Sequence, residues 1–240
     1  MTNELILKKE EAFFLLDEIL GKNFPTKNAR IGRDILATIL TGAVEDELHH
    51  CFISWPNILY YPHDKMEEIP DLTEYGRDVV IRRIRSVLKY SWEHEGEDSR
   101  VETLGYFYPI RPEPKEFVYG LLTYMMTKAH LNGESPKDQR IRQEIFGCVR
   151  PGEVRTERDF SILVTIVDYL QKYYYDEKPV SFSKYLRMAC AANLYPERIS
   201  KFLQKINWSV RFGFKDPDLA FDTRPQKFVE CWLALLHAAD

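Results

Sequence analysis

Residues 181–207 read SFSKYLRMACAANLYPERISKFLQKIN, and their spacing predicts two short helices joined by a tight turn. Ala189 is the small residue that two touching helices require, and Asn193, four residues later, belongs to a type that tolerates positive φ. Pro196 fits the first position of the second helix, where its missing N–H costs no hydrogen bond. The second helix then has a buried face of apolar side chains at Ile199, Phe202 and Leu203.

This stretch resembles helix–turn–helix units in general and identifies no particular family. It carries a local charge of +4 in a chain whose formal net charge is −4. A local excess of positive charge is suited to phosphate, so nucleic acid is one candidate partner. The side chains that would contact DNA or RNA lie on the outward face of the second helix and in the segment after it: Arg198, Lys201, Gln204, Lys205 and Arg211.

The segment after the second helix favours a small β-hairpin over 208–223. Residues 208–214, WSVRFGF, alternate as a strand does, and 215–218, KDPD, are typical of a turn. A hairpin in this place would complete a winged helix, but Asp216 and Asp218 at its tip would repel a DNA backbone. Two helices at this spacing also occur in ordinary bundles, so helix packing or contact with a protein is the favoured interpretation.

Composition places the chain among globular proteins. It has 240 residues, of which 45% are hydrophobic and 29% are charged. Its isoelectric point near 5.9 argues against a generally basic nucleic-acid coat protein. The four cysteines are far apart and form no C-x-x-C pair, which is typical of reduced thiols in a cytoplasmic protein. No apolar run approaches the roughly 20 residues of a membrane span, and no signal peptide is expected.

Hydrophobic periodicity predicts an all-α fold with a multi-helix, bundle-like body and the helix–turn–helix-like unit near the C-terminus. The proline-rich residues 103–114, TLGYFYPIRPEP, cannot form one continuous helix. We therefore expect a subdomain boundary there, with an N-terminal helical subdomain over 1–110 and a C-terminal one over 111–240. The predicted helices span 5–20, 29–52, 75–93, 115–130, 136–146, 156–174 and 225–239, and residues 56–70 are expected to be irregular.

The helix predicted at 75–93 combines a buried apolar face with a strongly basic one. The basic side chains are Arg82, Arg83, Arg85 and Lys89. They are suited to a phosphate backbone or to an acidic partner. The favoured interpretation is that they pair with the acidic residues around 67–74 and 93–98 and keep the helix soluble.

One polar cluster, Glu45-Asp46-Glu47-Leu48-His49-His50, has the spacing of a metal site. Glu47 and His50 are three residues apart, as in the E-x-x-H motifs of di-iron bundles. A di-iron site needs a second such motif, which the sequence lacks, and a zinc site would need a distant third ligand. A solvated helix end is therefore the favoured interpretation of this cluster.

The chain contains no complete catalytic constellation. G-x-S-x-G, G-x-x-x-x-G-K-[ST] and G-x-G-x-x-G motifs are all missing, and 11 glycines leave little material for a phosphate-cradling loop. No catalytic residue and no cofactor is assigned. The sequence therefore predicts a non-catalytic accessory or regulatory protein that binds another macromolecule, most naturally a protein partner. A DNA- or RNA-binding regulator that uses 181–207 is the alternative, and a metal-dependent enzyme around Glu47 and His50 is the second alternative.

Overall fold

The chain is described by a computed structural model over residues 5–46, 54–69, 72, 76–94, 102–188, 194–206 and 224–238. Within these ranges it has ten helices of six residues or more and no β-strand. The predicted all-α fold is confirmed, while the predicted hairpin over 208–223 lies outside the described residues. No helix in the same ranges is long and apolar enough to cross a membrane.

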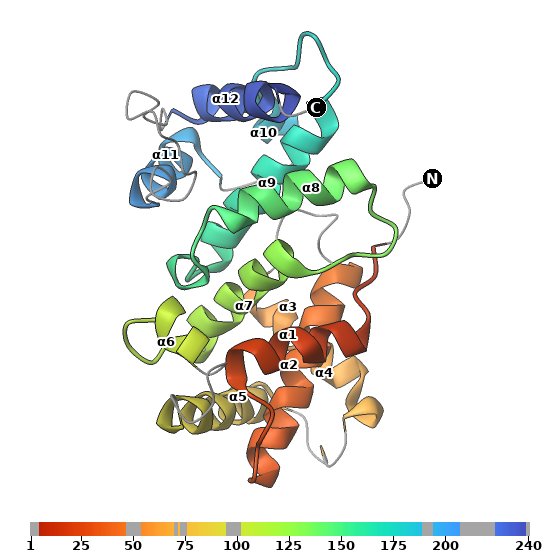
Figure 1. The fold of residues 1–240 in the computed structure, drawn as a ribbon, viewed down its shortest axis with the longest axis vertical. Coiled ribbons are helices and arrows are strands. Elements are labelled where there is room, and N and C mark those ends of the chain that lie inside the picture. Colours follow the sequence, from red (N-terminus) through yellow and green to blue (C-terminus); the bar gives the residue numbers. More distant parts are fainter. Residues whose placement is uncertain are drawn as a thin grey trace.

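The first half of the chain forms the lower part of the molecule in Figure 1. Its elements are α1 (Lys9–Leu20), α2 (Lys27–Asp46), α3 (Trp55–Ile58), α4 (Tyr61–Asp64), the 3-10 helix η2 (Met66–Glu68), α5 (Arg77–Glu93), α6 (Glu102–Phe107) and α7 (Pro114–Lys128). Helix α2 packs along α5, and α1 packs on α2. Gly21 ends α1 with φ of 76°, a backbone conformation that glycine adopts without steric cost.

The second half forms the upper part in the same view. It comprises α8 (Pro136–Gly147), the 3-10 helix η3 (Pro151–Glu153), α9 (Glu157–Tyr173), α10 (Phe182–Met188), α11 (Pro196–Lys205) and α12 (Pro225–Ala238). Helix α8 packs on α9, while α9, α10 and α11 each contact α12. Helix α7 joins the two halves, because it packs on α1, α2 and α5 as well as on α8 and α9.

Buried apolar side chains from Leu7 to Leu236 form one continuous core through both halves. The helices that build it begin where the sequence offers capping groups. Ser135 Oγ accepts a hydrogen bond from the backbone N–H of Asp138 at the start of α8 (3.1 Å). Thr156 and Asp159 form a reciprocal capping box at the start of α9. The predicted division at residue 110 stays a prediction.

Two sequence predictions are corrected by the structure. Residues 5–8 precede α1 rather than belonging to it, and Ile6 pairs with Asn132 in an isolated antiparallel bridge. The segment expected to be irregular after Trp55 instead forms α3, α4 and η2. Ser54 caps α3, and Pro56 lies in its first turn. Backbone N–H groups in the first turn have no intrahelical acceptor, so the missing N–H of proline costs no hydrogen bond there. The proline therefore starts a helical turn here instead of ending one.

The contact between α9 and α10 contains a carboxyl group whose protonation affects stability. Tyr185, buried on α10, donates a hydrogen bond to Asp168 on α9. Burial raises the pKa of Asp168 above its ordinary value of 3.8, and the neighbouring Lys172 only partly offsets this. The folded state therefore holds this proton more tightly than the unfolded state does. As a result, Asp168 makes a contribution to stability at low pH. This contribution is lost as pH rises from the pKa of Asp168 in the unfolded state to its higher pKa in the folded state.

We expect Asp168→Asn to be more stable than the unchanged protein at neutral pH. The amide stays neutral, and its oxygen still accepts the hydrogen bond from Tyr185, so the cost of a buried charge is removed. Urea denaturation at pH 4 and pH 8 measures this effect, and the advantage of the variant should be larger at pH 8. An advantage that shrinks with rising pH would contradict the assignment. Asp176→Asn, at a carboxyl group with exposed surroundings, is the matched control.

Candidate functional site

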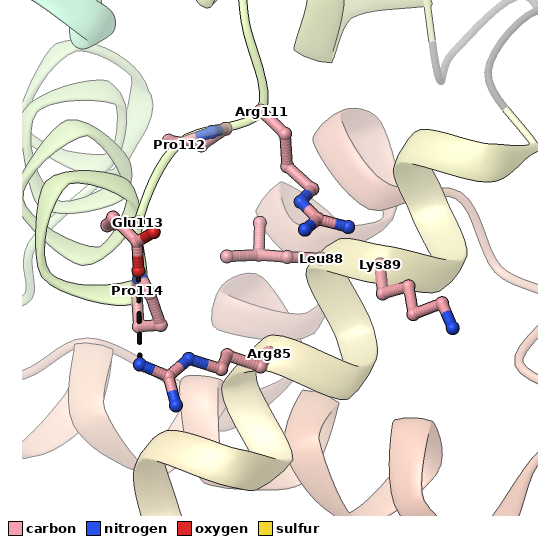
Figure 2. A pocket seen from close by; sticks show the side chains of 7 residues that line it. All are labelled: Arg85, Leu88, Lys89, Arg111, Pro112, Glu113 and Pro114. Atoms are coloured by element: carbon pink, nitrogen blue, oxygen red, sulfur yellow. Dashed lines mark ion pairs between the residues drawn. The ribbon is translucent and has the colours of Figure 1, made fainter.

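A hollow opens on the surface between α5 and the proline-rich segment that leads into α7. Its volume is about 200 Å³, and Figure 2 shows the side chains around it. They come from two stretches far apart in sequence: Arg85, Leu88 and Lys89 from α5, and Arg111, Pro112, Glu113 and Pro114 from the segment before and at the start of α7. We call this feature the basic hollow, because three of its seven side chains are cationic.

The α5 side of the basic hollow follows from the amphipathic pattern of that helix. Val80, Ile84, Val87 and Leu88 are buried, so the opposite side of the helix faces solvent. Arg85 and Lys89 lie four residues apart and therefore project on the same side, each with 65% of its side chain exposed. Leu88 lies between them in sequence and contributes an apolar wall to the hollow.

The other side of the basic hollow is stiffened by prolines at positions 109, 112 and 114. Pro112 and Pro114 are buried, whereas Ile110 and Arg111 are exposed. Ile110 is 73% exposed, the second-highest value among the large hydrophobic side chains described as exposed. Each proline fixes its own φ and restricts the residue before it, so this segment loses little conformational freedom when a partner binds.

The charges around the hollow are only weakly compensated. Arg85 lies 3.9 Å from the carboxylate of Glu113, and Lys89 lies 3.8 Å from that of Glu93, in pairs that are largely exposed. Exposed pairs at such distances contribute little. Glu113 also belongs to the capping box of α7 with Glu116. In the described part of the chain, no carboxylate lies within 4 Å of Arg111, whose guanidinium extends toward Leu88 in Figure 2.

The four side chains of the predicted basic face of α5 differ in their exposure. Arg82, Arg85 and Lys89 are exposed, as expected for side chains that meet a partner. Arg83 instead is half-buried and donates a hydrogen bond to the side chain of Asn28 on α2. Its guanidinium therefore helps to hold α5 on α2.

The second predicted basic surface lies on α11. Ile199, Phe202 and Leu203 are buried, as the sequence pattern predicted. The side chains predicted to contact nucleic acid are exposed on that helix: Arg198, Lys201, Gln204 and Lys205. Arg211 lies outside the described residues, and so do residues 189–193, where the turn between α10 and α11 was predicted. The helix–turn–helix geometry therefore stays a prediction.

Glu47 and His50, the centre of the metal site considered as the second alternative, also lie outside the described residues. Glu45, at the end of the described part of α2, forms an ion pair with Lys65 (2.8 Å). In the ranges that the structure describes, no three His, Cys, Asp or Glu side chains are placed to hold a metal ion.

Sequence reasoning missed Arg111, which lines the basic hollow, and Ile110, which is exposed beside it. Their signal lies in the residues 109–114, PIRPEP. A basic and a large apolar side chain lie exposed between prolines that restrict the backbone, and exposed connecting segments of this kind often carry binding residues. Comparison of the chain with protein-family models, with curated proteins and with solved structures finds no match. The function is therefore argued from the site itself.

Proposed function

We propose that this chain is a non-catalytic accessory or regulatory protein that binds a protein partner, and that the basic hollow receives an acidic side chain of that partner. One observation carries the proposal: Arg85, Lys89 and Arg111 surround an open hollow with an apolar wall. Two segments supply these cations, and prolines stiffen one of them. Such an arrangement is suited to recognition, because little has to be reorganised on binding.

The size of the hollow favours one side chain of a macromolecule over a whole small molecule. Sites for drug-sized ligands usually measure roughly 300–1,000 Å³. The basic hollow measures about 200 Å³ and is open to solvent on one side. Ile110, exposed on the adjoining segment, offers an apolar contact for residues that flank the inserted side chain. Arginine is enriched at protein interfaces, and an exposed apolar residue beside it adds apolar contact area.

The charge of the hollow selects an acidic side chain. Three cations line it against one lining carboxylate, that of Glu113, and Glu93 lies 3.8 Å from Lys89 outside the lining. At 3.9 Å from Arg85, Glu113 competes only weakly with an incoming carboxylate. The planar guanidinium groups of Arg85 and Arg111 can each bind a carboxylate through two parallel hydrogen bonds.

The proposal is tested with a fluorescein-labelled peptide of alternating glutamate and leucine, and with a matched peptide in which glutamine replaces glutamate. We expect fluorescence anisotropy at low salt to show tighter binding of the acidic peptide. Arg85→Glu and Arg111→Glu should each weaken that binding at least about tenfold, which corresponds to about 1.4 kcal/mol. Rising salt should weaken it further, since the charges that meet are exposed.

Lys128→Glu is the matched control. Lys128 is exposed at the C-terminal end of α7, whereas the hollow lies at the N-terminal end of the same helix, about 20 Å away by the helical rise. This variant makes the same change of net charge and should bind the acidic peptide as the unchanged protein does. Equal affinity for the two peptides, or equal losses in all three variants, would refute the basic hollow as the binding site.

A further inference from the structure

Helix α11 carries a second charged surface, separate from the basic hollow. Its apolar side chains Ile199, Phe202 and Leu203 are buried, and the helix packs on α12. Figure 1 shows α11 at the edge of the upper part of the molecule, away from α5. We use the name α11 face for the exposed residues on its other side, of which one is acidic: Tyr195, Glu197, Arg198, Lys201, Gln204 and Lys205.

The cations of the α11 face lie in a row. Arg198, Lys201 and Lys205 are three and four residues apart, so they follow one side of the helix over about 10 Å. Lys205 Nζ donates to the backbone carbonyl of Glu153 (3.2 Å), a contact that positions the ammonium group without neutralising its charge. In the described part of the chain, no carboxylate lies within 4 Å of Lys201. Glu197 is the one acidic side chain of α11, and it lies one turn before Lys201 on the same exposed side, so the three cations are opposed by a single carboxylate.

An exposed aromatic ring stands at the start of this row. Tyr195, the N-cap residue of α11, is 56% exposed. The guanidinium of Arg198 lies 5.5 Å from the centre of its ring. An exposed tyrosine next to an arginine offers a flat surface on which a base can stack, with cationic groups close by for the adjacent phosphates.

We infer that the α11 face binds single-stranded nucleic acid. Arg198, Lys201 and Lys205 contact successive phosphates, and Tyr195 stacks on a base. A repeating polyanion matches a row of cations better than a single acidic side chain does, and the exposed ring gives a base something to pack on. The region 181–207 is positively charged in a chain that is negative overall, so an approaching strand is steered to this face.

The test is a fluorescence-anisotropy titration of the full chain with a labelled, mixed-sequence 20-nucleotide DNA strand. Three phosphate contacts predict that affinity falls roughly 20-fold between 50 and 200 mM salt. Arg198→Gln/Lys201→Gln should weaken binding and reduce the slope of affinity against salt by about two-thirds. Tyr195→Leu should weaken binding of the single strand at least about fivefold and leave the salt slope unchanged.

Two comparisons make the test decisive. Arg30→Gln/Lys128→Gln removes two exposed positive charges outside α11 and should bind the strand as the unchanged protein does. A duplex of the same sequence should bind more weakly and respond little to Tyr195→Leu, because its bases are already stacked. The inference would be overturned if the strand did not bind at 50 mM salt, or if the two double variants lost the same amount of affinity. It would also be overturned if the protein preferred the duplex and Tyr195→Leu left that preference unchanged. The hollow variant Arg85→Glu should bind the strand unchanged, so this outcome is independent of the proposed function.

Discussion

Replacing Arg142 with alanine should cost about 3–5 kcal/mol of the free energy of unfolding, more than any other single change proposed for this protein. Arg142 lies on α8 and is only 2% exposed. Its guanidinium donates to both carboxylate oxygens of Glu134 (2.9 and 3.1 Å from Nε) and to the backbone carbonyls of Met126 and Ala129. Those two carbonyls belong to the end of α7, where a helix leaves its last acceptors without intrahelical donors.

The cost is large because alanine would leave several buried acceptors unpaired at once. The side chain of Glu134 is 4% exposed, so its charge would remain in the interior without a counterion. In a domain of this size, such a loss lowers the melting temperature by roughly 10 °C. Chemical denaturation followed by circular dichroism measures the free energy of unfolding, and thermal denaturation followed by the same signal measures the melting temperature.

Arg140→Ala on the same helix is the control. Arg140 forms a partly exposed i,i+4 pair with Glu144 at 2.9 Å, and helix pairs of this spacing contribute about 0.3–0.5 kcal/mol. The double variant Arg142→Met/Glu134→Gln, which removes both charges, should lose less stability than the two single changes summed. If Arg142→Ala and Arg140→Ala had the same small effect, the buried network would not contribute as described.

Arg142 also marks a limit of sequence reasoning. The pattern of residues 136–146 predicts an amphipathic helix, and α8 confirms it. Nothing in that pattern tells a buried arginine from an exposed one. Its burial depends on the end of α7 lying beside α8, which is a tertiary contact between residues 13 and 16 positions apart.

The two basic surfaces were predictable to different extents. The α11 face follows from local spacing, since Ile199, Phe202 and Leu203 alternate with charged residues at helical intervals. The basic hollow was only half predictable. Arg85 and Lys89 follow from the periodicity of α5, but Arg111 joins them because the proline-rich segment returns across α5 before α7 begins. Periodicity within one helix carries no information about such a return.

The short helices after Trp55 show a different reason for error. Pro56, directly after Trp55, suggested that residues 56–70 are irregular, because proline interrupts a continuing helix. In the structure Pro56 and Pro62 each lie in the first turn of a four-residue helix, where they are well tolerated. The same residue type therefore ends one helix and starts another. Ser54 caps α3 with its side chain, whereas Tyr60 makes no such cap at α4, so a capping residue alone does not decide the outcome.

Gly32→Ala should also destabilise the protein, and it acts on the contact between α2 and α5 that positions the basic hollow. Gly32 lies on α2 where that helix packs along α5. A Cβ at this position would overlap the backbone carbonyl oxygen of Arg83 and a methyl group of Val87. The carbonyl belongs to the α5 backbone and cannot move alone, so the two helices must separate. Overpacking of this kind costs about 1–3 kcal/mol, partly offset by the better helix propensity of alanine.

Gly147→Ala is the matched control, and we expect it to raise stability where Gly32→Ala lowers it. A Cβ there would meet Thr127 at 3.6 Å, an ordinary contact, so the change should stabilise α8 by up to about 1 kcal/mol. Truncating Val87 to alanine in the Gly32→Ala background should restore little stability, since the clash with the carbonyl remains. Equal stability of Gly32→Ala and the unchanged protein would show that α2 and α5 are less tightly packed than the structure indicates.

The same variant connects packing to the proposed site. Arg85 and Lys89 belong to α5, whereas Arg111 belongs to the segment before α7. Separating α2 from α5 should move the first two cations relative to the third while leaving every charge in place. We therefore expect Gly32→Ala to weaken binding of the acidic peptide at a temperature where the variant is still folded, and Gly147→Ala to leave it unchanged. Binding that survives a displaced α5 would mean that net charge alone, and not the geometry of the basic hollow, attracts the peptide.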